Sequence, residues 1–273
     1  MTDAPLAGLD RDKVRATLFA AADAASALTL PRFRTGLAVE NKFTVGFDPV
    51  TAADMEAETA IRAVLEAAFP EHGIIGEEWD PKLSQSAFEW IIDPIDGTRA
   101  FISGVPVWGT LIGLTYRGRA IAGLMAQPFS GEAWLGLPGE TSFRHGATSG
   151  TVKTSAVTSL ARAKLSTTSP ELFVGALGPV WTAVRGAALM CRYGLDCYAY
   201  CLLASGHLDL VVEAGLKNVD IAPLIPIIEN AGGVITTWEG GPAEAGGNCV
   251  AAATPQLHRE AVALIAASRA AAV

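Results

Sequence analysis

The sequence has few basic residues, and they form no cluster. Its 273 residues include 20 Lys and Arg against 28 Asp and Glu, so the formal net charge is −8 and the sequence pI is near 5.0. A protein that binds nucleic acid non-specifically needs grouped basic side chains to neutralise phosphates. The composition therefore argues against a nucleic-acid partner, whereas the acidic balance suits a protein that concentrates divalent cations.

Long apolar runs are also absent, although the mean hydropathy is +0.33. Glycine, proline and charged residues interrupt every apolar run before it reaches the ~18 residues that a membrane-spanning helix needs. Asp3 and Asp10 lie near the N-terminus, which shows no basic segment followed by an apolar one, as a secretory signal would. We therefore expect no membrane partner and no export.

Cysteine and histidine are scarce, with four of each. The cysteines include no Cys-x-x-Cys pair, and no histidine lies at the spacing of a zinc site. Cys197 and Cys201, one helical turn apart, are therefore interpreted as small core residues rather than metal ligands. Such cysteine usage favours a reduced, cytoplasmic setting. The histidines are expected in loops or on the surface, without a catalytic role: His72, His145, His207 and His258.

What the sequence does contain is a short apolar run, residues 90–92, that leads directly into two acids. The run is typical of a buried strand, and Pro94 predicts a turn between Asp93 and Asp96. Two carboxylates this close repel each other unless a cation lies between them, and oxygen ligands suit Mg²⁺. The segment therefore predicts a metal site. The alternative interpretation is a turn with two solvated acids.

Gly97 and Thr98 follow these acids directly. Glycine allows the backbone to pass close to a ligand. A helix that begins here would direct its free backbone N–H groups at an anion. The same short segment therefore predicts a phosphate site beside the metal site.

Three further acids lie where an element is expected to begin or end. Glu77 follows the apolar residues 74–76, a strand expected to lie beside the one before Asp93. Asp54 and Asp220 are each expected to open a helix, and the second helix contains a proline at position 226 that should kink it. An acid at a helix start is often only a cap, so residue type alone leaves the role of Asp54 open.

In this order the motifs resemble the signature of the inositol-monophosphatase-like, metal-dependent phosphatases. The stretches that carry the resemblance are residues 51–54 (TAAD), 76–78 (GEE), 93–98 (DPIDGT), Asp220 and residues 229–233 (ENAGG). Within that family, further stretches are most similar to bacterial histidinol-phosphate phosphatases: residues 98–101, 107–110, 166–170 and 192–198. One position departs from the pattern, because Val219 stands where the family has an aromatic residue, which puts the packing support of Asp220 in question.

The resemblance implies a set of site residues and a mechanism. Two or three Mg²⁺ ions would be bound by Glu77, Asp93, the Ile95 carbonyl, Asp96 and Asp220. Asp54 with Thr98 would position and activate the attacking water, and the backbone N–H groups of Gly97 and Thr98 would hold the phosphate. Hydrolysis of a small phosphate monoester would then proceed by direct attack of water, without a phospho-enzyme.

The substrate that the resemblance indicates is L-histidinol phosphate, an intermediate of histidine biosynthesis. Its ammonium and its imidazole call for carboxylates away from the metals. The candidates are Asp196, which is expected to open a helix and could equally be a cap, and Glu213. The family places a substrate-contacting acid seven residues before the last metal ligand, and Glu213 has that spacing from Asp220.

Two other functions stay open on the sequence alone. One is an inositol-monophosphatase-like enzyme of broad or nucleotide-phosphate specificity. The other is a non-catalytic regulator that binds metal or phosphate. The presence of Thr98, Asp54 and every acid of the expected metal site argues against a regulator.

The fold that the resemblance implies is an α/β layered sandwich (αβαβα, sugar-phosphatase type) with a largely antiparallel larger sheet and a smaller mixed or parallel sheet. Apolar runs separated by turn residues predict an antiparallel meander over residues 107–137. Residues 141–159 are small and polar and are expected to form a surface loop, and residues 40–50 a loop or hairpin. From Lys164 onward, strands alternate with helices, as in a smaller α/β layer.

The chain length and a hydrophobic content of 50% against 18% charged residues are sufficient for a large core. We expect two halves. Residues 1–150 would carry most metal ligands, and residues 151–273 the substrate contacts and the last metal ligand. Nothing in the sequence itself gives the oligomeric state, and a homodimer is expected from the resemblance alone.

Overall fold

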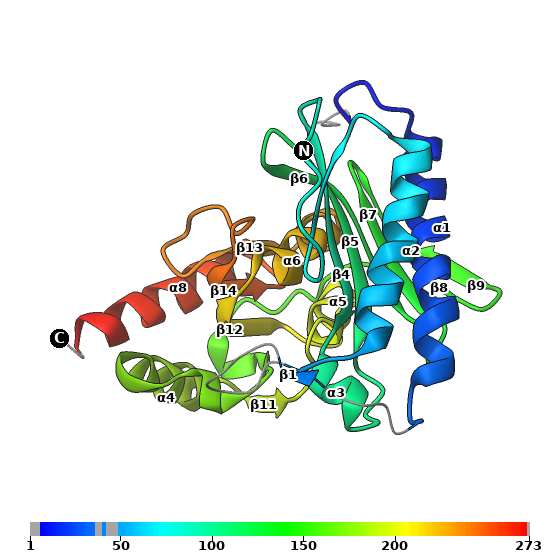
Figure 1. The fold of residues 1–273 in the computed structure, drawn as a ribbon. Coiled ribbons are helices and arrows are strands. Elements are labelled where there is room, and N and C mark those ends of the chain that lie inside the picture. Colours follow the sequence, from blue (N-terminus) through cyan, green and yellow to red (C-terminus); the bar gives the residue numbers. More distant parts are fainter. Residues whose placement is uncertain (1–5, 36–39, 42–48, 272–273) are drawn as a thin grey trace.

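The computed structural model describes residues 6–35, 40–41 and 49–271. The chain folds into five layers in the order helix, sheet, helix, sheet, helix (Figure 1). The expected αβαβα sandwich is therefore confirmed. None of the helices in the described ranges is long and apolar enough to cross a bilayer. The short strands β1 (Glu40–Asn41) and β2 (Pro49–Val50) pair antiparallel, and the middle of the hairpin expected there lies outside the described residues.

The larger sheet has its strands in sequence order, with β3 parallel to β4 and every later neighbour antiparallel. Its outer face is covered by the first two long helices, which bury an apolar stripe against it. These elements are α1 (Arg11–Thr29), α2 (Ala52–Ala68), β3 (Gly73–Gly76), β4 (Phe88–Asp96), β5 (Gly109–Tyr116), β6 (Arg119–Gln127), β7 (Glu132–Leu137), β8 (Glu140–His145) and β9 (Thr148–Thr151).

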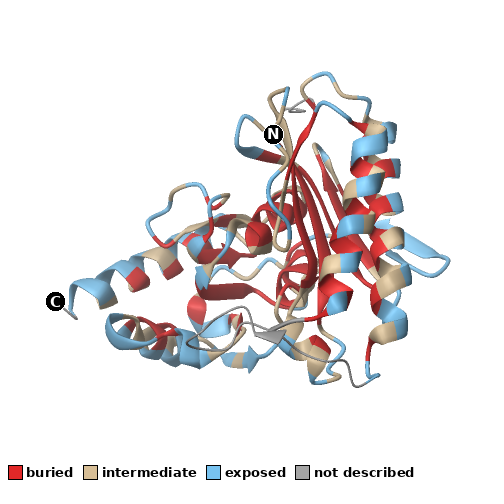
Figure 2. Ribbon diagram, viewed as in Figure 1, coloured by how far each residue is buried: buried red, intermediate tan, exposed pale blue. Residues whose placement is uncertain are grey.

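The smaller sheet is mixed, with strand order β11-β10-β12-β14-β13. Two helices cover its outer face, and short helices fill the layer between the sheets. The smaller sheet and its cover comprise β10 (Lys164–Thr167), α4 (Gly178–Ala187), β11 (Met190–Tyr193), β12 (Leu210–Leu216), β13 (Val234–Thr237), β14 (Gly247–Ala252) and α8 (Pro255–Ala270). The middle layer comprises α5 (Tyr198–Ala204), α6 (Asn218–Ile221), the 3-10 turn η5 (Ala222–Leu224) and α7 (Ile225–Asn230). Figure 2 shows buried residues along both sheets and exposed residues on the outer faces of the covering helices.

The expected meander is confirmed as β5, β6 and β7. The expectation of a surface loop over residues 141–159 is wrong for residues 141–151, whereas residues 152–159 do form a loop. Strands β8 and β9 continue the larger sheet through residue 151. Most residues of β8 and β9 are polar, so apolar and polar residues do not alternate along them. The sequence therefore contained no signal for these two strands. Strand β8 pairs with β7, and β9 pairs with β8. The ring of Phe143 in β8 also lies 5.0 Å from that of Trp134 in β7. The division into halves at residue 150 stays a prediction.

Two histidines expected at the surface or in loops are buried. His72 is only 5% exposed and lies between the rings of Phe69 and Phe88, at centroid distances of 4.7 and 4.9 Å. Burial lowers the pKa of His72, which favours a neutral ring in this apolar stack. His258 is 9% exposed, and its Nε2 lies 2.8 Å from the Thr236 hydroxyl.

The helix expected from Asp220 is broken into three short pieces, α6, η5 and α7. Pro226 therefore lies in the first turn of α7, where its missing N–H leaves no hydrogen bond unmade, and not in a helix interior as expected. The break allows the backbone of this segment to run flat against the larger sheet. Asp220 is the third residue of the first piece, α6.

A row of glycines across the larger sheet receives this broken helix. Gly113, Gly123 and Gly136 are direct cross-strand neighbours on β5, β6 and β7. A Cβ at Gly123 would lie 1.8 Å from the Pro223 carbonyl oxygen, and one at Gly136 would lie 2.3 Å from the Pro226 carbonyl carbon. Only glycine permits this approach, so the row fixes how close the middle layer lies to the sheet.

We expect Gly123→Ala to lower the free energy of unfolding by about 1–3 kcal/mol, because the added methyl group overlaps the Pro223 backbone. Gly150→Ala is the matched control, since Gly150 belongs to β9 of the same sheet and a Cβ there meets nothing within 4 Å. Urea denaturation of both variants in EDTA measures the difference. Equal midpoints would contradict the role assigned to the glycine row.

Candidate active site

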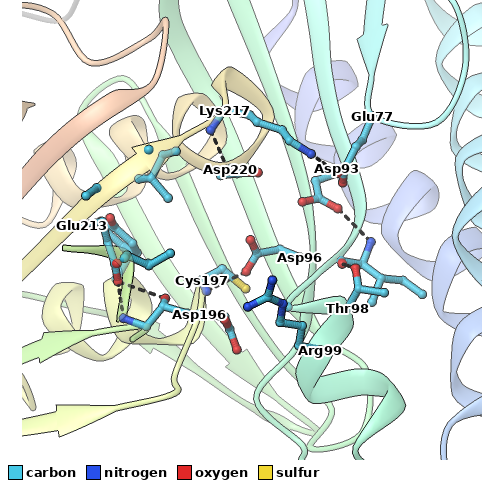
Figure 3. A pocket seen from close by; sticks show the side chains of 18 residues that line it. Glu77, Asp93, Asp96, Thr98, Arg99, Asp196, Cys197, Glu213, Lys217 and Asp220 are labelled. Carbon is cyan, nitrogen blue, oxygen red and sulfur yellow. Dashed lines mark hydrogen bonds and ion pairs between the residues drawn. The ribbon is translucent and has the colours of Figure 1, made fainter. Parts of the chain in front are cut away.

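The sequence predicted a turn between the two acids of the DPIDGT segment. Instead, both Asp93 and Asp96 lie within strand β4. Between Asp93 and Asp96 the pairing of β4 with β5 shifts register, so the strand carries a bulge there. Pro94 has no N–H for the ladder, and a bulge tolerates this; its carbonyl accepts a hydrogen bond from the Thr110 hydroxyl at 2.9 Å. The bulge places both acids at the wall of one cavity (Figure 3).

Gly97 and Thr98 do open a helix, as predicted. Gly97 has φ +80° and caps α3 (Thr98–Ile102). A Cβ at Gly97 would lie only 3.1 Å from the carboxyl group of Asp196. Glycine is therefore favoured both by the positive φ and by the lack of room for a side chain. The Thr98 hydroxyl donates a hydrogen bond to the Ile95 carbonyl at 3.1 Å.

Glu77 reaches the same cavity from the neighbouring strand. Strand β3 pairs parallel with β4, as expected, and Glu77 follows its last residue. The Lys217 ammonium lies 2.8 Å from Glu77 Oε1 and lines the cavity with it. Sequence reasoning did not single out Lys217, although its position three residues before Asp220 was a usable signal.

Asp220 enters the cavity from the middle layer. Its Oδ2 accepts a hydrogen bond from the backbone N–H of Lys217 at 2.7 Å. The residue before it, Val219, is 2% exposed and packs against Ile91 and Ala222, with Ile75 nearby. Aliphatic side chains of the larger sheet therefore supply the packing support that the missing aromatic residue had put in question.

The acids fit a divalent cation. One carboxylate oxygen from each of Asp93, Asp96 and Asp220 lies within 4.8 Å of the other two. Burial and then the charge of Glu77 raise the pKa of Asp93, while burial and nearby carboxylates raise that of Asp96. Both shifts mean that negative charge is unfavourable here without a cation. An all-oxygen donor set of this kind suits Mg²⁺.

Asp54 lies behind this cluster and does not open its helix. Thr51 is the N-cap of α2, and Asp54 is the third helical residue, so Asp54 lies in the first turn of the expected helix but is not its first residue. Its Oδ2 accepts hydrogen bonds from the Thr51 backbone N–H at 2.8 Å and hydroxyl at 2.7 Å. Asp54 is 1% exposed and does not line the cavity, yet its charge contributes to the raised pKa of Asp93.

The far side of the cavity from Glu77 carries Glu213 (Figure 3). Three donors hold its carboxylate: the Thr167 hydroxyl at 2.9 Å, the Thr168 backbone N–H at 2.6 Å and the Thr168 hydroxyl at 3.0 Å. Burial nevertheless raises the pKa of Glu213 to about 7. A buried carboxyl whose anion is disfavoured in this way would gain from a cationic ligand.

Asp196 lines the same part of the cavity, but it is not the helix cap that the sequence suggested. Helix α5 begins at Tyr198, and Asp196 has φ +45°, a left-handed conformation that Asp tolerates. Burial raises the pKa of Asp196 to about 6, and the charge of Arg99 opposes this shift. The next residue, Cys197, donates its backbone N–H to Asp96 Oδ2 at 2.7 Å, which joins this loop to the acid cluster.

A buried acid that sequence reasoning missed holds the loop that carries Glu77. Glu58 of α2 is fully buried, and its Oε2 accepts a hydrogen bond from the backbone N–H of Glu78 at 2.7 Å. Its Oε1 accepts one from Arg62 Nε at 2.8 Å. A Cβ at Gly76 would lie 1.9 Å from the same carboxylate. The Glu–Arg pair one turn apart was visible in the sequence, but only the fold shows that it faces inward.

Known proteins with the same pattern identify the family. The sequence pattern of the inositol monophosphatase family matches residues 10–271. The chain belongs to this family. A family relative, the chloroplastic bifunctional phosphatase IMPL2 of Arabidopsis thaliana, is 39% identical over 268 residues, which cover 94% of this chain and 76% of the relative. The histidinol-phosphatase of Chlorobaculum parvum is 35% identical over 219 residues, 80% of this chain and 83% of that one.

A solved family structure agrees with the fold. The inositol monophosphatase of Zymomonas mobilis superimposes with a TM-score of 0.82 at 39% identity, covering 93% of this chain and 98% of the other. The inositol monophosphatase family is metal-dependent, and the relatives are phosphatases. The chain is therefore a phosphoric monoester hydrolase of this family.

We expect Glu58→Ala to weaken Mg²⁺ binding by about 10–100-fold, because Glu58 orients the backbone beside Glu77. Activity should recover at high Mg²⁺, and Glu58→Gln should retain more affinity since it keeps an acceptor. Glu56→Ala is the control, because Glu56 lies on the same helix, 49% of its side chain is exposed, and its partner Arg32 does not line the active-site cavity. Mg²⁺ titrations followed by activity and by melting temperature test this, and equal Mg²⁺ affinities would refute the positioning role.

Proposed function

We propose that this protein hydrolyses L-histidinol phosphate to L-histidinol and phosphate, a step of histidine biosynthesis. The observation that carries the proposal is the presence of a buried carboxyl group, Glu213, and a half-buried one, Asp196, in the cavity that holds the acid cluster. The ammonium of histidinol, and its imidazole when protonated, would offset the cost of burying these charges. Relatives named histidinol-phosphatase support the same substrate.

We propose Mg²⁺ as the cofactor, two or three ions per site, held by Glu77, Asp93, the Ile95 carbonyl, Asp96 and Asp220. When bound, the ions would clamp phosphate oxygens, lower the pKa of a water molecule and stabilise the leaving alkoxide. The clustered oxygens of three of these acids and the raised pKa of Asp93 and Asp96 support the assignment.

The remaining roles fall to the chain's own groups at the start of α3. The Thr98 hydroxyl donates to the Ile95 carbonyl, so its oxygen is left to accept a hydrogen bond from the attacking water and orient it. Asp54, which lies outside the cavity, would help Thr98 to position and activate this water. The backbone N–H groups of Gly97 and Thr98 would hold the phosphate. Direct attack by water is favoured because burial raises the pKa of Cys197, the thiol in the cavity, which keeps it a poor nucleophile.

An inositol-monophosphatase-like enzyme of broader or nucleotide-phosphate specificity is the second candidate. The similarity to the Zymomonas mobilis inositol monophosphatase favours it, because that protein is as similar in sequence as IMPL2. A phosphate-release assay with histidinol phosphate, inositol 1-phosphate and 3′-phosphoadenosine 5′-phosphate separates the candidates. A preference for either of the last two would overturn the histidinol assignment, and no release from any of them would favour a regulator.

The expected homodimer remains a proposal, as do the cytoplasmic setting and the absence of nucleic-acid and membrane partners. One surface supports the dimer. Large apolar side chains are exposed along edge strand β11 and the neighbouring turn: Leu172 36%, Val174 71%, Leu189 64%, Met190 41% and Tyr193 44%. No described strand pairs with the outer edge of β11, and exposed apolar groups beside such an edge are typical of a protein contact.

We expect activity to be lost in EDTA and restored by Mg²⁺, and Asp93→Asn to be inactive yet folded. The asparagine side chain keeps an oxygen for the hydrogen bond from the Ile95 backbone N–H, which spans 3.0 Å in the native protein. In EDTA the variant should melt at or above the native temperature, because one charge of a repelling cluster is gone. Added Mg²⁺ should stabilise the native protein more than the variant. Full turnover in EDTA would end the metal proposal.

We expect Asp196→Asn and Glu213→Gln each to lower kcat/KM for histidinol phosphate by roughly 10–100-fold, the value of a charge-assisted hydrogen bond to a desolvated ammonium. Asparagine is a conservative choice at the left-handed position 196. Steady-state phosphate release is the measurement, and glycerol 2-phosphate, which has no cationic group, is the control substrate. Equal losses on both substrates would show that these acids support the fold or the metal site instead of the substrate.

A further inference from the structure

A second cavity lies on the other side of helix α5 from the proposed active site. Its volume is about 270 Å³, and no described residue lines both cavities. Three aromatic rings form its walls: Trp134 of β7, Phe143 of β8 and Tyr198 of α5. The Trp134 ring lies 5.0 Å from Phe143 and 5.5 Å from Tyr198, the latter edge to face. These walls fit the flat faces of a planar group.

The same cavity carries charges of both signs. Glu132 Oε2 accepts hydrogen bonds from the Tyr198 and Ser130 hydroxyls, both at 2.7 Å, while no described residue donates to its other oxygen, Oε1. Lys153 lines the same cavity and has no ion pair with any residue in the described ranges. His207 also lines the cavity. An acceptor with spare capacity and an ammonium without a counter-charge are therefore held around one set of rings.

This combination selects the class of ligand. A simple amine would meet the Lys153 ammonium, and a simple carboxylic acid would meet Glu132, so each would suffer one like-charge contact. A zwitterion satisfies both groups at once, and the rings add contact area for a planar side chain. We propose that this cavity binds a free α-amino acid with a planar side chain, its ammonium on Glu132 and its carboxylate on Lys153.

Helix α5 connects this cavity to the proposed active site. Tyr198, its first residue, lines the second cavity and is hydrogen-bonded to Glu132. The preceding residue, Cys197, donates its backbone N–H to Asp96. A ligand that pulls on the Tyr198–Glu132 pair would therefore change the position of an N–H that orients a proposed metal ligand. This coupling rests on the proposed function, whereas the binding site itself does not.

Calorimetric titration of the full-length, Mg²⁺-loaded protein tests the site. L-Phenylalanine and L-histidine are the probes, and glycine, phenethylamine and 3-phenylpropionate each lack one recognised group. Binding is expected for at least one of the two probes and not for the other three compounds. Lys153→Ala and Glu132→Gln should each weaken it by about tenfold or more. Lys82→Ala removes the same charge outside the cavity and should bind as the native protein does.

Lys153 is exposed and lies outside the active-site cavity, so loss of binding in its variant assigns the ligand to the second cavity. Failure of both amino acids to bind, or equal binding in Lys153→Ala, overturns the proposal. For the coupling, a saturating amino acid should change KM or the Mg²⁺ requirement by about fivefold or more in the native protein and not in Lys153→Ala. Binding without any such change overturns the coupling and leaves the site supported, and failure of the histidinol assay does not affect the titration.

Discussion

The close approach of the broken middle helix to the larger sheet is the constraint on which the active-site cavity depends. Glycines at 113, 123 and 136 leave no side chain between the strands and the backbone of Pro223 and Pro226. Asp220 lies in α6, at the start of this segment. The distance between the segment and the glycine row therefore sets how close the Asp220 carboxylate lies to β4. A wider separation of the layers would take Asp220 away from Asp93 and Asp96.

The acid cluster is assembled against its own repulsion. Each carboxylate of the cluster accepts a hydrogen bond from a backbone N–H group, which partly offsets its negative charge. The donors are Ile95 for Asp93, Cys197 for Asp96 and Lys217 for Asp220. The Lys217 ammonium pairs with Glu77, and buried Glu58 fixes the loop beside it. The fold thus holds a set of carboxylates that repel one another unless a cation is present, and this supports a metal-dependent enzyme.

The acids that we propose to bind the substrate differ from ordinary surface acids because they are shielded from solvent. Glu213 and Asp196 line the same cavity as the proposed metal site, and burial raises the pKa of both. Helix α5 and the loop before it contribute to both cavities, because Asp196 and Cys197 line one and Tyr198 lines the other. This short helix and the loop before it therefore link the acids of the proposed substrate site, the hydrogen bond to Asp96 and the proposed amino-acid site.

The sequence alone was enough for the meander, because apolar runs are local in the chain. It was also enough for the family, because its motifs are local, and the resemblance to the family then implied the five-layer fold. It was also enough to nominate Glu77 beside Asp93, since adjacent parallel strands end at one edge. It failed where contacts join residues distant in sequence. The burial of His72, the inward face of Glu58 and the polar strands β8 and β9 depend on what packs against them. Only the tertiary structure decides such contacts, because distance and desolvation are properties of the packed layers and not of the local sequence.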